Sequence, residues 1–485
     1  MLTVATFTTA TTPRFPVVSI PTLPSVGLTD AEKNLVSRRF AVGRTQAAEM
    51  ELCNAYYEGL QRLTNLGIAI PKELEGLRTI VGWPAMAVDP IEDRLTVEGF
   101  RRPGSVDIDL EVQDQWDGNG MGGEQSLAHL DALSMGSGWV TIGTPDDDSG
   151  LSVIRVESPL NMAALWDART LTLKSALQTY LEDDALHAAL YQPGLTVYLA
   201  TDENGVWQLV RRDEHGYDGI PVERLANRAR SSRRDGASEI TPAVRSLTDA
   251  ACRSLLQLAV AGEFYSIPRY LILGATEKDF QDQDGNPVPV WETYINTINA
   301  LERDENGDVP TVTQLTAYDP SVFTRVLDWY AAKMAGMLRA TPQDLGIYTE
   351  GNPPSADAVQ FADSRRDRYA RRKQAAWGPV WSRVAQHSMR MVNGGKLPAG
   401  MDRLEADWAP VSMPSLGAVG NFIAQAVPNQ VLPPTADVLL KMAGLTAVQR
   451  AQVARERRDH ASEQALTEIG NRFLNPAKTF RVDGG

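Results

Sequence analysis

The chain has 485 residues, of which 43% are hydrophobic and 22% are charged, proportions close to those of average globular proteins. It carries 61 acidic and 47 basic side chains, and the net charge of −14 excludes a globally basic nucleic-acid coat. A local basic patch, or a channel through which DNA passes without sticking, remains compatible with that charge. The two cysteines, Cys53 and Cys252, exclude a disulfide framework and a cysteine-rich zinc module, and they favour a reducing compartment.

No targeting or membrane-spanning segment is predicted. Residues 1–25 are rich in Thr and Pro and lack a basic start followed by an apolar core, so we expect a flexible arm. The longest uncharged run, residues 408–436, contains five prolines and four amide side chains, which a membrane helix would not carry.

Residues 26–240 predict a mixture of helices and strands. Thr29 is an N-cap followed by an acidic first turn, and the helix is expected to continue to about Asn65. Residue patterns and turn signals predict a helix over residues 127–133 and strands over residues 95–100, 138–142, 151–157, 195–199 and 206–211. The elements lack the regular spacing of a doubly wound sheet, which indicates an α/β or α+β region.

Two long helices follow a basic, serine-containing loop at residues 224–236. The first is predicted over residues 241–266, with Pro242 in its first turn, and the second from Asp319, an N-cap followed by Pro320, to about residue 339. Each helix has one apolar face at helical spacing, formed by Val244, Leu247, Ala251, Leu255 and Leu258 in the first and by Phe323, Val326, Tyr330, Met334 and Met337 in the second.

The segment between these helices is strongly acidic. Residues 266–319 hold ten acidic and three basic side chains, which is half of the chain's net charge. Strands are predicted over residues 269–274 and 309–315, and a helix over residues 290–303. We therefore expect a small acidic α/β insert between two long helices.

A Gly- and Pro-rich loop, a long helix and a helical C-terminal region complete the chain. The helix is predicted over residues 355–393, with a kink at Gly378-Pro379. It carries a basic run, which either contacts phosphates or acidic neighbours or is a solvated face paired with nearby aspartates. The run consists of Arg365, Arg366, Arg368, Arg371, Arg372 and Lys373. Near the C-terminus, Thr446 and Gln449 form a capping box for a helix to about residue 472.

No motif provides a convincing active site. Residues 118–123 match G-x-G-x-x-G, but no apolar strand precedes them, which favours a flexible turn over a dinucleotide site. Gly395-Lys396 lacks the remaining residues of a phosphate-binding P-loop, and the five histidines are isolated, so neither a nucleotide nor a zinc site is predicted. The aspartates at residues 146–148 are typical of a hairpin tip, and no cofactor is expected. A structural or assembly role is favoured over catalysis.

The order of several segments resembles the portal proteins of tailed double-stranded-DNA bacteriophages, of the type found in siphovirus-like phages of actinobacteria. The resemblance extends over about residues 35–458. It is carried by VGWPAMAVD (81–89), RLTVEGFR (94–101), WDGN (116–119), AHLDALSMG (128–136), SP (158–159), Asp167, GASEI (236–240), IPRY (267–270), Gly274 and NPPSAD (352–357).

The resemblance implies an α+β fold of portal type and a division of the chain into named regions. These are an arm (1–25), an α/β wing (26–240), stem helices (241–265 and 319–340), an acidic clip (266–318), a tunnel loop (341–354), a long kinked helix (355–393), a helical crown (394–472) and a tail (473–485). In the virion, about twelve copies would form a ring at one capsid vertex. DNA would pass through the ring in both directions, without sequence specificity. The major capsid protein, scaffold, large terminase and head–tail adaptor would be partners, and the host cytoplasm would be the site of synthesis.

The same resemblance assigns roles to side chains. The tunnel loop would face DNA through Gln343, Asp344, Tyr348, Thr349, Glu350 and Asn352. The clip would dock terminase or adaptor through acidic residues, including Glu277, Asp279, Asp282, Asp284, Glu302, Asp304 and Glu305. Acidic walls would keep the duplex from sticking, although ordinary solubility or attraction to a basic adaptor explains the clip's charge equally well.

A lone pair of long helices cannot hide two apolar faces, so neighbouring copies would cover them in a closed ring. We therefore expect a charge at Leu255 or Met334 to prevent assembly. Two alternatives remain: another structural head protein, such as a minor capsid or adaptor component, and a phosphate- or nucleotide-binding enzyme that uses residues 118–123. The long helices around an acidic insert favour the portal over the first alternative, and the missing strand disfavours the second.

Overall fold

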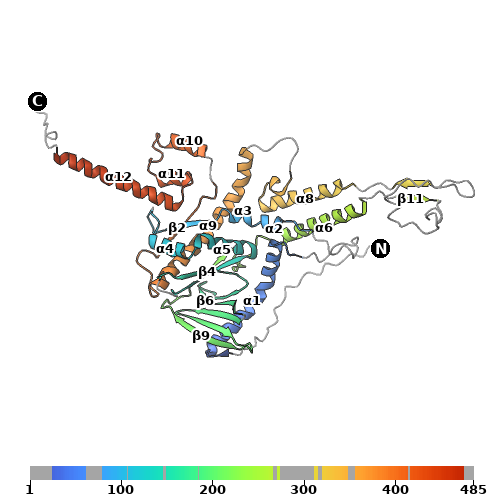
Figure 1. The fold of residues 1–485 in the computed structure, drawn as a ribbon, viewed down its shortest axis with the longest axis horizontal. Coiled ribbons are helices and arrows are strands. Elements are labelled where there is room, and N and C mark those ends of the chain that lie inside the picture. Colours follow the sequence, from blue (N-terminus) through green and yellow to red (C-terminus); the bar gives the residue numbers. More distant parts are fainter. Residues whose placement is uncertain are drawn as a thin grey trace, which may run out of the picture. The chain divides into compact units, whose positions relative to one another are not determined.

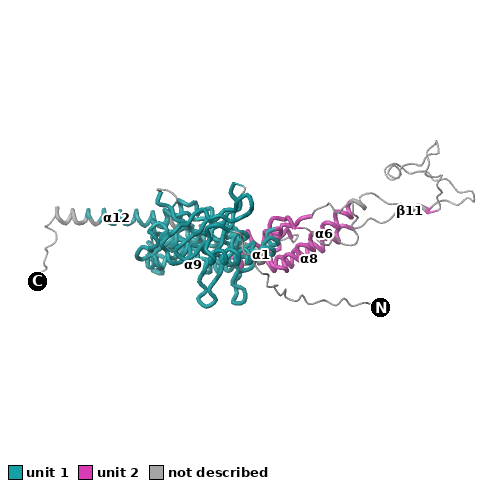
Figure 2. Tube along the Cα trace, turned by 90° about the horizontal axis from the view of Figure 1, so that it is seen from below, with its two compact units in different colours: residues 1–54, 90–239, 367–485 teal, residues 55–89, 240–366 magenta. Residues whose placement is uncertain are grey.

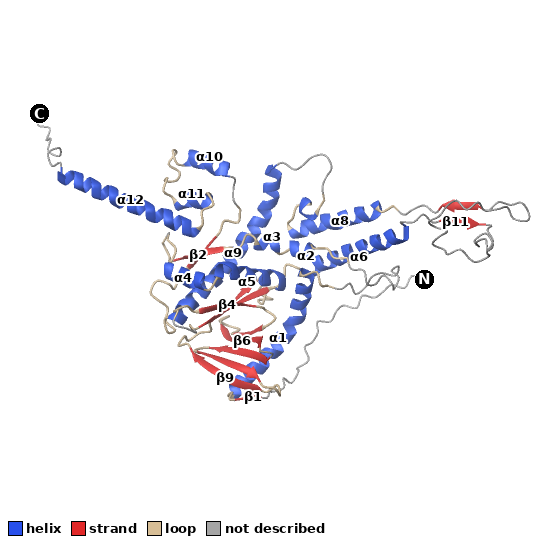
Figure 3. Ribbon diagram, viewed as in Figure 1, coloured by secondary structure: helices blue, strands red, loops and turns tan. Residues whose placement is uncertain are grey.

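The structure is a computed structural model. It describes residues 25–61, 79–105, 107–145, 149–183, 185–265, 270–273, 311–314, 319–347, 356–412 and 416–474. The chain divides into two compact units, coloured separately in Figure 2. Unit 1 comprises residues 1–54, 90–239 and 367–485, and unit 2 comprises residues 55–89 and 240–366. Both contain helices and strands, and the fold is of mixed α and β composition (Figure 3).

Helix α1 (Asp30–Tyr57) begins where the sequence predicts and ends earlier. The backbone N–H of Thr29 donates to the Glu32 carboxylate at 2.8 Å, and the Glu32 N–H donates to the Thr29 hydroxyl at 3.3 Å, which together form a capping box. Glu32 also accepts two hydrogen bonds from Arg212, and these bonds lower its pKa to about 2. The helix was predicted to continue to Asn65, but it ends at Tyr57, and Gly59 adopts a φ of +67° that a helix does not have. The prediction is therefore wrong for residues 58–61, and residues 62–65 lie outside the described residues.

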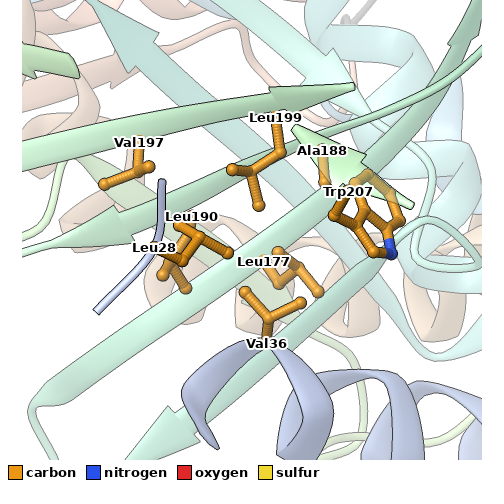
Figure 4. Close-up of a cluster of buried hydrophobic side chains, with 8 residues drawn as sticks. All are labelled: Leu28, Val36, Leu177, Ala188, Leu190, Val197, Leu199 and Trp207. Atoms are coloured by element: carbon orange, nitrogen blue, oxygen red, sulfur yellow. The ribbon is translucent and has the colours of Figure 1, made fainter. Parts of the chain in front are cut away.

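Unit 1 contains a six-stranded sheet in the order β1-β9-β8-β7-β6-β5. Its strands are β1 (Ser25–Val26), β5 (Met162–Trp166), β6 (Leu173–Glu182), β7 (Ala185–Gln192), β8 (Leu195–Thr201) and β9 (Trp207–Glu214). β1 pairs with β9 in parallel, and the remaining pairs are antiparallel. One face of the sheet packs against Leu28 and Val36 in a buried cluster with Leu177, Ala188, Leu190, Val197, Leu199 and Trp207 (Figure 4).

The opposite face packs on a second, three-stranded sheet. Its order is β10-β3-β4, formed by β10 (Val222–Ala226), β3 (Ser137–Gly143) and β4 (Val153–Glu157). Side chains from both sheets share one core, which includes Trp139, Met162, Ala176, Ala189, Tyr191, Ile220 and Val222. All five predicted strands of the wing are confirmed, with shifted ends.

The sequence analysis did not predict six strands of unit 1, namely β1, β5, β6, β7, β10 and the strand over Glu405–Trp408, nor the helix over Leu110–Gly118. It assigned no strand to β5, β6 or β7, and it placed Arg224 in a loop, whereas Arg224 lies on β10. The sequence of β7, ALHAALYQ, is rich in good helix formers, and pairing with β6 and β8 overrides that preference. β10 is defined by pairing with β3, a contact about 85 residues distant in sequence.

Helices α4 (Leu110–Gly118), α5 (Met121–Met135) and α9 (Ala356–Val392) meet the sheets of unit 1 through an aromatic core. Trp377 and Trp381 of α9 are almost fully buried. The His129 ring of α5 stacks on Trp377 with centroids 5.3 Å apart, and the Trp381 indole N–H donates to His129 Nε2 at 2.9 Å. Burial lowers the pKa of His129 to about 3, so this histidine is neutral in the folded protein.

The C-terminal part of unit 1 is attached by a strand and three helices. β13 (Glu405–Trp408) pairs with β2 (Val97–Arg101), and it is followed by α10 (Leu416–Ala426), α11 (Asp437–Met442) and α12 (Ala447–Leu474). The predicted capping box is confirmed, since the Thr446 N–H donates to Gln449 and the Gln449 N–H donates to Thr446.

Unit 2 is built on two long helices, α6 (Pro242–Tyr265) and α8 (Ser321–Leu338), which lie side by side (Figure 1). α6 leads toward β11 (Tyr270–Leu273), and α8 follows β12 (Thr311–Gln314). β11 and β12 pair antiparallel, so the described parts of both predicted clip strands are confirmed. The predicted helix over residues 290–303 lies outside the described residues. Two short helices, α2 (Trp83–Met86) and α3 (Asp89–Glu92), lie where the chain passes from unit 2 to unit 1 at residues 89–90.

Candidate functional site

The stem hairpin, defined here as α6 and α8, buries one face of each helix within the chain. On α6 the buried side chains are Val244, Thr248, Ala251, Cys252, Ser254, Leu256 and Val260. On α8 they are Ala331, Met334, Ala335 and Leu338. Small alanines at the contact allow the helices to approach closely, and the packing is confined to the C-terminal half of α8. The single chain therefore stabilises only part of the hairpin.

The rest of α8 presents large apolar side chains to solvent. Trp329 is 56% exposed and Val322, Val326 and Met337 are 37–39% exposed. Residues 322, 326, 329 and 337 follow helical spacing and share one face, which we call the outer stripe. A shallow cavity of about 300 Å³ lies on it, lined by Val322, Arg325, Val326, Trp329 and Tyr330. Lys333 sits over the Trp329 ring at 5.4 Å and borders this surface.

The predicted apolar faces correspond only partly to the buried ones. Val244, Ala251 and Met334 are buried as expected, whereas Leu247, Leu255, Leu258, Phe323 and Tyr330 are half-buried. Val326 and Met337, predicted on the packed face of the second helix, are exposed on the outer stripe. Because both helices have apolar residues around more than half of their circumference, the sequence did not show which side the partner helix takes.

The start of the predicted tunnel loop is folded back on its own chain. Residues 343–345 form a short 3-10 helix, η3 (Gln343–Leu345). The Asp344 carboxylate accepts hydrogen bonds from the Thr341 N–H at 2.7 Å and from Arg366 at 2.5 Å. Asp344 was predicted to face DNA, but its carboxylate serves an internal contact between this loop and α9. Tyr348, Thr349, Glu350 and Asn352 lie outside the described residues, as do all seven acidic clip residues named above.

The basic run of α9 separates into internal and external cations. Arg366 is buried and pairs with Asp344 and Asp363. Lys373 is also buried, and it binds Glu239 at 3.1 Å and the Asn227 side chain. The prediction that the run contacts external phosphates or neighbouring subunits is wrong for these two residues, because each buried cation is paired with a carboxylate of the same chain. The exposed members of the run are Arg365, Arg368, Arg371 and Arg372.

A buried ion network that the sequence analysis missed fastens the C-terminal helices to β2 and β13. Asp407 accepts from Arg101 and Lys441 at 2.7 Å each and from Arg450 at 2.5 Å. Arg450 also pairs with Asp437 at 2.7 Å. Burial works to raise the pKa of Asp407, but the surrounding cations prevail and hold it below its usual value. No local signal reveals this network, because Arg101 and Arg450 are about 350 residues apart.

The glycine-rich segment at residues 118–123 is an ordered helix junction. α4 ends at Gly118, Gly120 has a φ of +65° and α5 starts at Met121. The prediction of a flexible turn is wrong, since Gly122 and Gly123 lie in the first turn of α5. Cys53 and Cys252 are buried, and neither forms a disulfide. The aspartates at residues 146–148 are outside the described residues.

The described residues show neither a metal-binding cluster nor a membrane-spanning helix. They contain no group of three or more His, Cys, Asp or Glu side chains placed to hold a metal ion. None of the helices in this part of the chain is long and apolar enough to span a membrane.

Comparison with known proteins identifies the family. A family model described as "Phage portal protein, SPP1 Gp6-like" matches residues 41–458. The portal protein of Mycobacterium phage L5 is 31% identical over 410 residues, which cover 82% of this chain and 83% of that protein. The portal protein of Mycobacterium phage D29 is 32% identical over 373 residues, which cover 75% and 76% of the two chains. The chain belongs to the phage portal protein family.

Among solved structures, chains of gene transfer agent particles match this chain. A chain of the neck of the native particle, computed with C12 symmetry, covers 76% of this chain and 92% of its own length, with 12% identity and a TM-score of 0.42. A chain of the native virion covers 81% of this chain and 98% of its own length, with 14% identity and a TM-score of 0.37.

Proposed function

We propose that twelve copies of this chain form a closed ring at one vertex of a phage capsid, and that DNA enters and leaves through the ring. In this proposal residues 26–240 are the wing, residues 241–265 and 319–340 the stem, residues 266–318 the clip and residues 394–472 the crown. Membership of the portal family supports the portal role. The role is structural rather than catalytic.

The outer stripe of α8 carries the proposal of a ring. Trp329 and its apolar neighbours on the outer stripe are exposed, and an exposed apolar row of this kind marks an interaction surface. The half-buried Leu247, Leu255 and Leu258 of α6 provide a second, different apolar face. Contact between the stripe of one copy and the α6 face of the next is head-to-tail, and such contacts form a ring when the rotation between neighbouring copies closes.

The tunnel loop and the clip have separate roles in this proposal. Residues 341–354 face the duplex with polar and acidic side chains such as Gln343, so the phosphates find no cation and DNA moves with little friction. Asp344 holds the loop to α9 rather than contacting DNA. The acidic clip docks the large terminase during packaging and the head–tail adaptor afterwards. Capsid protein and scaffold contact the ring during head assembly.

Native mass spectrometry with negative-stain imaging of the purified full chain tests the ring. We expect an assembly of about 640 kDa with a central hole, from twelve chains of 53.0 kDa. The variant Trp329→Glu is expected to abolish rings while keeping the circular dichroism of the folded chain. Leu181→Glu is the matched control, since Leu181 is 77% exposed on β6 of unit 1, and it is expected to leave the rings intact.

Full-size rings of Trp329→Glu would contradict the assignment of the outer stripe as the subunit interface. Met334 is a poor site for this test, because it is fully buried within one chain and a charge there would damage the hairpin itself. Leu255, which is half-buried, remains a suitable second site.

A further inference from the structure

An arginine-rich hairpin connects β10 to the segment before α6. It comprises residues 228–235, with the sequence Arg-Ala-Arg-Ser-Ser-Arg-Arg-Asp. Arg230 and Arg233 exchange backbone hydrogen bonds of 2.9 and 3.0 Å, which places Ser231 and Ser232 at the tip. The base is closed by the buried Asn227, whose backbone and side chain both bond to Ala237. The hairpin is therefore an ordered projection rather than a loose basic loop.

Gly236 makes the base of this arginine hairpin tight. Its φ is +92°, and a Cβ at this position would lie 2.1 Å from the carbonyl oxygen of Gly136. Only glycine allows the backbone to approach so closely. The arginine hairpin is thus held at a fixed place beside β3.

Arg224 holds one strand of the arginine hairpin in place and pairs with Asp235, the only carboxylate of the hairpin. The Arg224 guanidinium lies over the Trp166 ring at 4.5 Å and near the Trp139 ring at 5.5 Å. It donates to the Asp235 carboxylate at 2.6 Å and to the Arg234 carbonyl at 3.1 Å. Because Asp235 is the hairpin's single acidic residue, the remaining arginines receive no neutralisation from within it.

Three arginines of the hairpin are left with their charge exposed. Arg230, Arg233 and Arg234 are all solvent-exposed, and among the residues that the structure describes none forms an ion pair with them. Glu239, the next acidic residue in sequence, is taken by Arg228 and Lys373. In a chain with a net charge of −14, this is a concentrated excess of positive charge.

The tip offers hydrogen-bond donors in an unbroken run. Residues 230–234 are Arg, Ser, Ser, Arg and Arg, and none of these side chains is apolar. Arg230 and Arg234 also line a cavity of about 610 Å³, which borders on Arg224 and Leu171. Arg169, exposed in the same turn as Leu171, adds a further cation to this side of unit 1.

We propose that the arginine hairpin binds the phosphate backbone of double-stranded DNA. A DNA backbone presents only acceptor oxygens in a dense row of negative charge, and guanidinium and serine groups are its usual backbone ligands. An acidic protein segment is less favoured, because protein interfaces gain most of their affinity from buried apolar anchors and residues 230–234 carry no apolar side chain; the apolar side chains of Trp166 and Leu171 line the neighbouring cavity. This binding site is separate from the proposed channel, in which the tunnel loop offers DNA no cation. The arginine hairpin belongs to unit 1, whereas the tunnel loop belongs to unit 2.

The test is the affinity of the purified full chain for a fluorescent 30-bp DNA duplex between 50 and 200 mM NaCl. The variant R230A/R233A/R234A removes the three exposed guanidiniums. The control R38A/R155A/R403A removes the same charge from three exposed arginines elsewhere in unit 1. We expect the hairpin variant to bind at least about tenfold more weakly at 50 mM NaCl. Its salt dependence should be shallower by about one unit of slope for each arginine that contacts a phosphate. The control should stay within about threefold of the unmodified chain.

Three results would overturn the proposal. They are an unmodified chain that does not bind the duplex at 50 mM NaCl, a hairpin variant that binds like the control, and poly-L-glutamate that displaces the fluorescent duplex at a lower concentration of charge than unlabelled duplex does. The third result would identify an acidic protein as the ligand. Particle mass is measured on the same samples, so loss of rings, which concerns the proposed function, is distinguished from loss of DNA affinity.

Discussion

The sheet and aromatic core of unit 1 and the stem hairpin of unit 2 satisfy their side chains in different ways. In unit 1, Trp377, Trp381 and His129 are buried against one another, and Asp407 is surrounded by three cations. In the stem hairpin, Met334 is buried, but Trp329 on the same helix is more than half exposed. The aromatic core and the Asp407 network of unit 1 are closed within one chain, although single apolar side chains such as Leu181 are exposed elsewhere on the unit, whereas α8 of the stem hairpin has one buried face and one exposed apolar face.

This difference separates the surfaces that one chain satisfies by itself from those that need a second copy. A core closes when each apolar face and each buried charge has a partner, and the charge network of Asp407 meets that condition without another copy. The outer stripe does not meet it. The four predictions below change one side of this comparison at a time.

The largest effect is expected from breaking the buried ion network. Asp407→Asn removes the charge that Arg101, Lys441 and Arg450 share, and it leaves the buried Arg450 short of a partner. We expect unit 1 to lose about 3–5 kcal/mol of unfolding free energy, measured by urea denaturation. Asp402→Asn is the control, since Asp402 is exposed and forms only a long, exposed ion pair of 3.8 Å with Arg403. This substitution should cost less than about 0.5 kcal/mol of unfolding free energy. Equal costs would mean that the network adds nothing.

The second prediction concerns acid. His129 has a folded pKa of about 3, below the value near 6.5 of an unfolded chain. Between about pH 6.5 and pH 3 the His129 ring is protonated in the unfolded chain but not in the folded one. The free energy of unfolding therefore falls as the pH drops through this range. The loss by pH 4 should be about 3 kcal/mol. His129→Gln should remove this part of the acid sensitivity in denaturation measured at several pH values. An unchanged slope would show that other groups cause it.

A smaller effect should separate the two faces of α8. Met334→Ala empties a buried position and is expected to cost about 2–4 kcal/mol of unfolding free energy. Val326→Ala removes a side chain that is 37% exposed and should cost less than about 1 kcal/mol in the monomer. Both are measured by urea denaturation under conditions where rings are absent. A larger cost at Val326 than at Met334 would reverse the inner and outer faces.

The smallest effect is local. Thr29→Ala removes the hydroxyl that accepts the Glu32 N–H at the start of α1, and about 1 kcal/mol should be lost. Thr29→Ser keeps the hydroxyl and should restore most of that loss. Thermal unfolding followed by circular dichroism measures both variants, and an alanine variant as stable as the serine variant would rule out a contribution from the cap.

Several features were predictable because their causes lie within a few residues. The starts of α1, α6 and α12 were anticipated from Thr29, Pro242 and Thr446, as capping and proline act on the next turn. The portal family was identified from ordered segments and is confirmed by comparison with portal proteins. The start of α8 is displaced by one residue, with Pro320 rather than Asp319 at the N-cap, and the Asp319 carboxylate accepts from the Ser321 N–H ahead of the first helical turn.

Other features depended on residues far apart in the sequence. β7 has the composition of a helix and becomes a strand between β6 and β8. Lys373 and Arg366 looked like members of a surface run, yet each is buried against a carboxylate brought from elsewhere. The arginine hairpin looked like an irregular basic loop until Arg224 was found between two tryptophans and bound to Asp235.

The sequence by itself determined the two long helices, the acidic segment between them and the family, because these follow from composition, short-range spacing and segment order. The tertiary structure decided which face of α8 is buried, which cations are internal and which arginines remain free to act. These depend on the partner that each side chain meets, and a burial or an ion pair exists only once distant segments have been brought together.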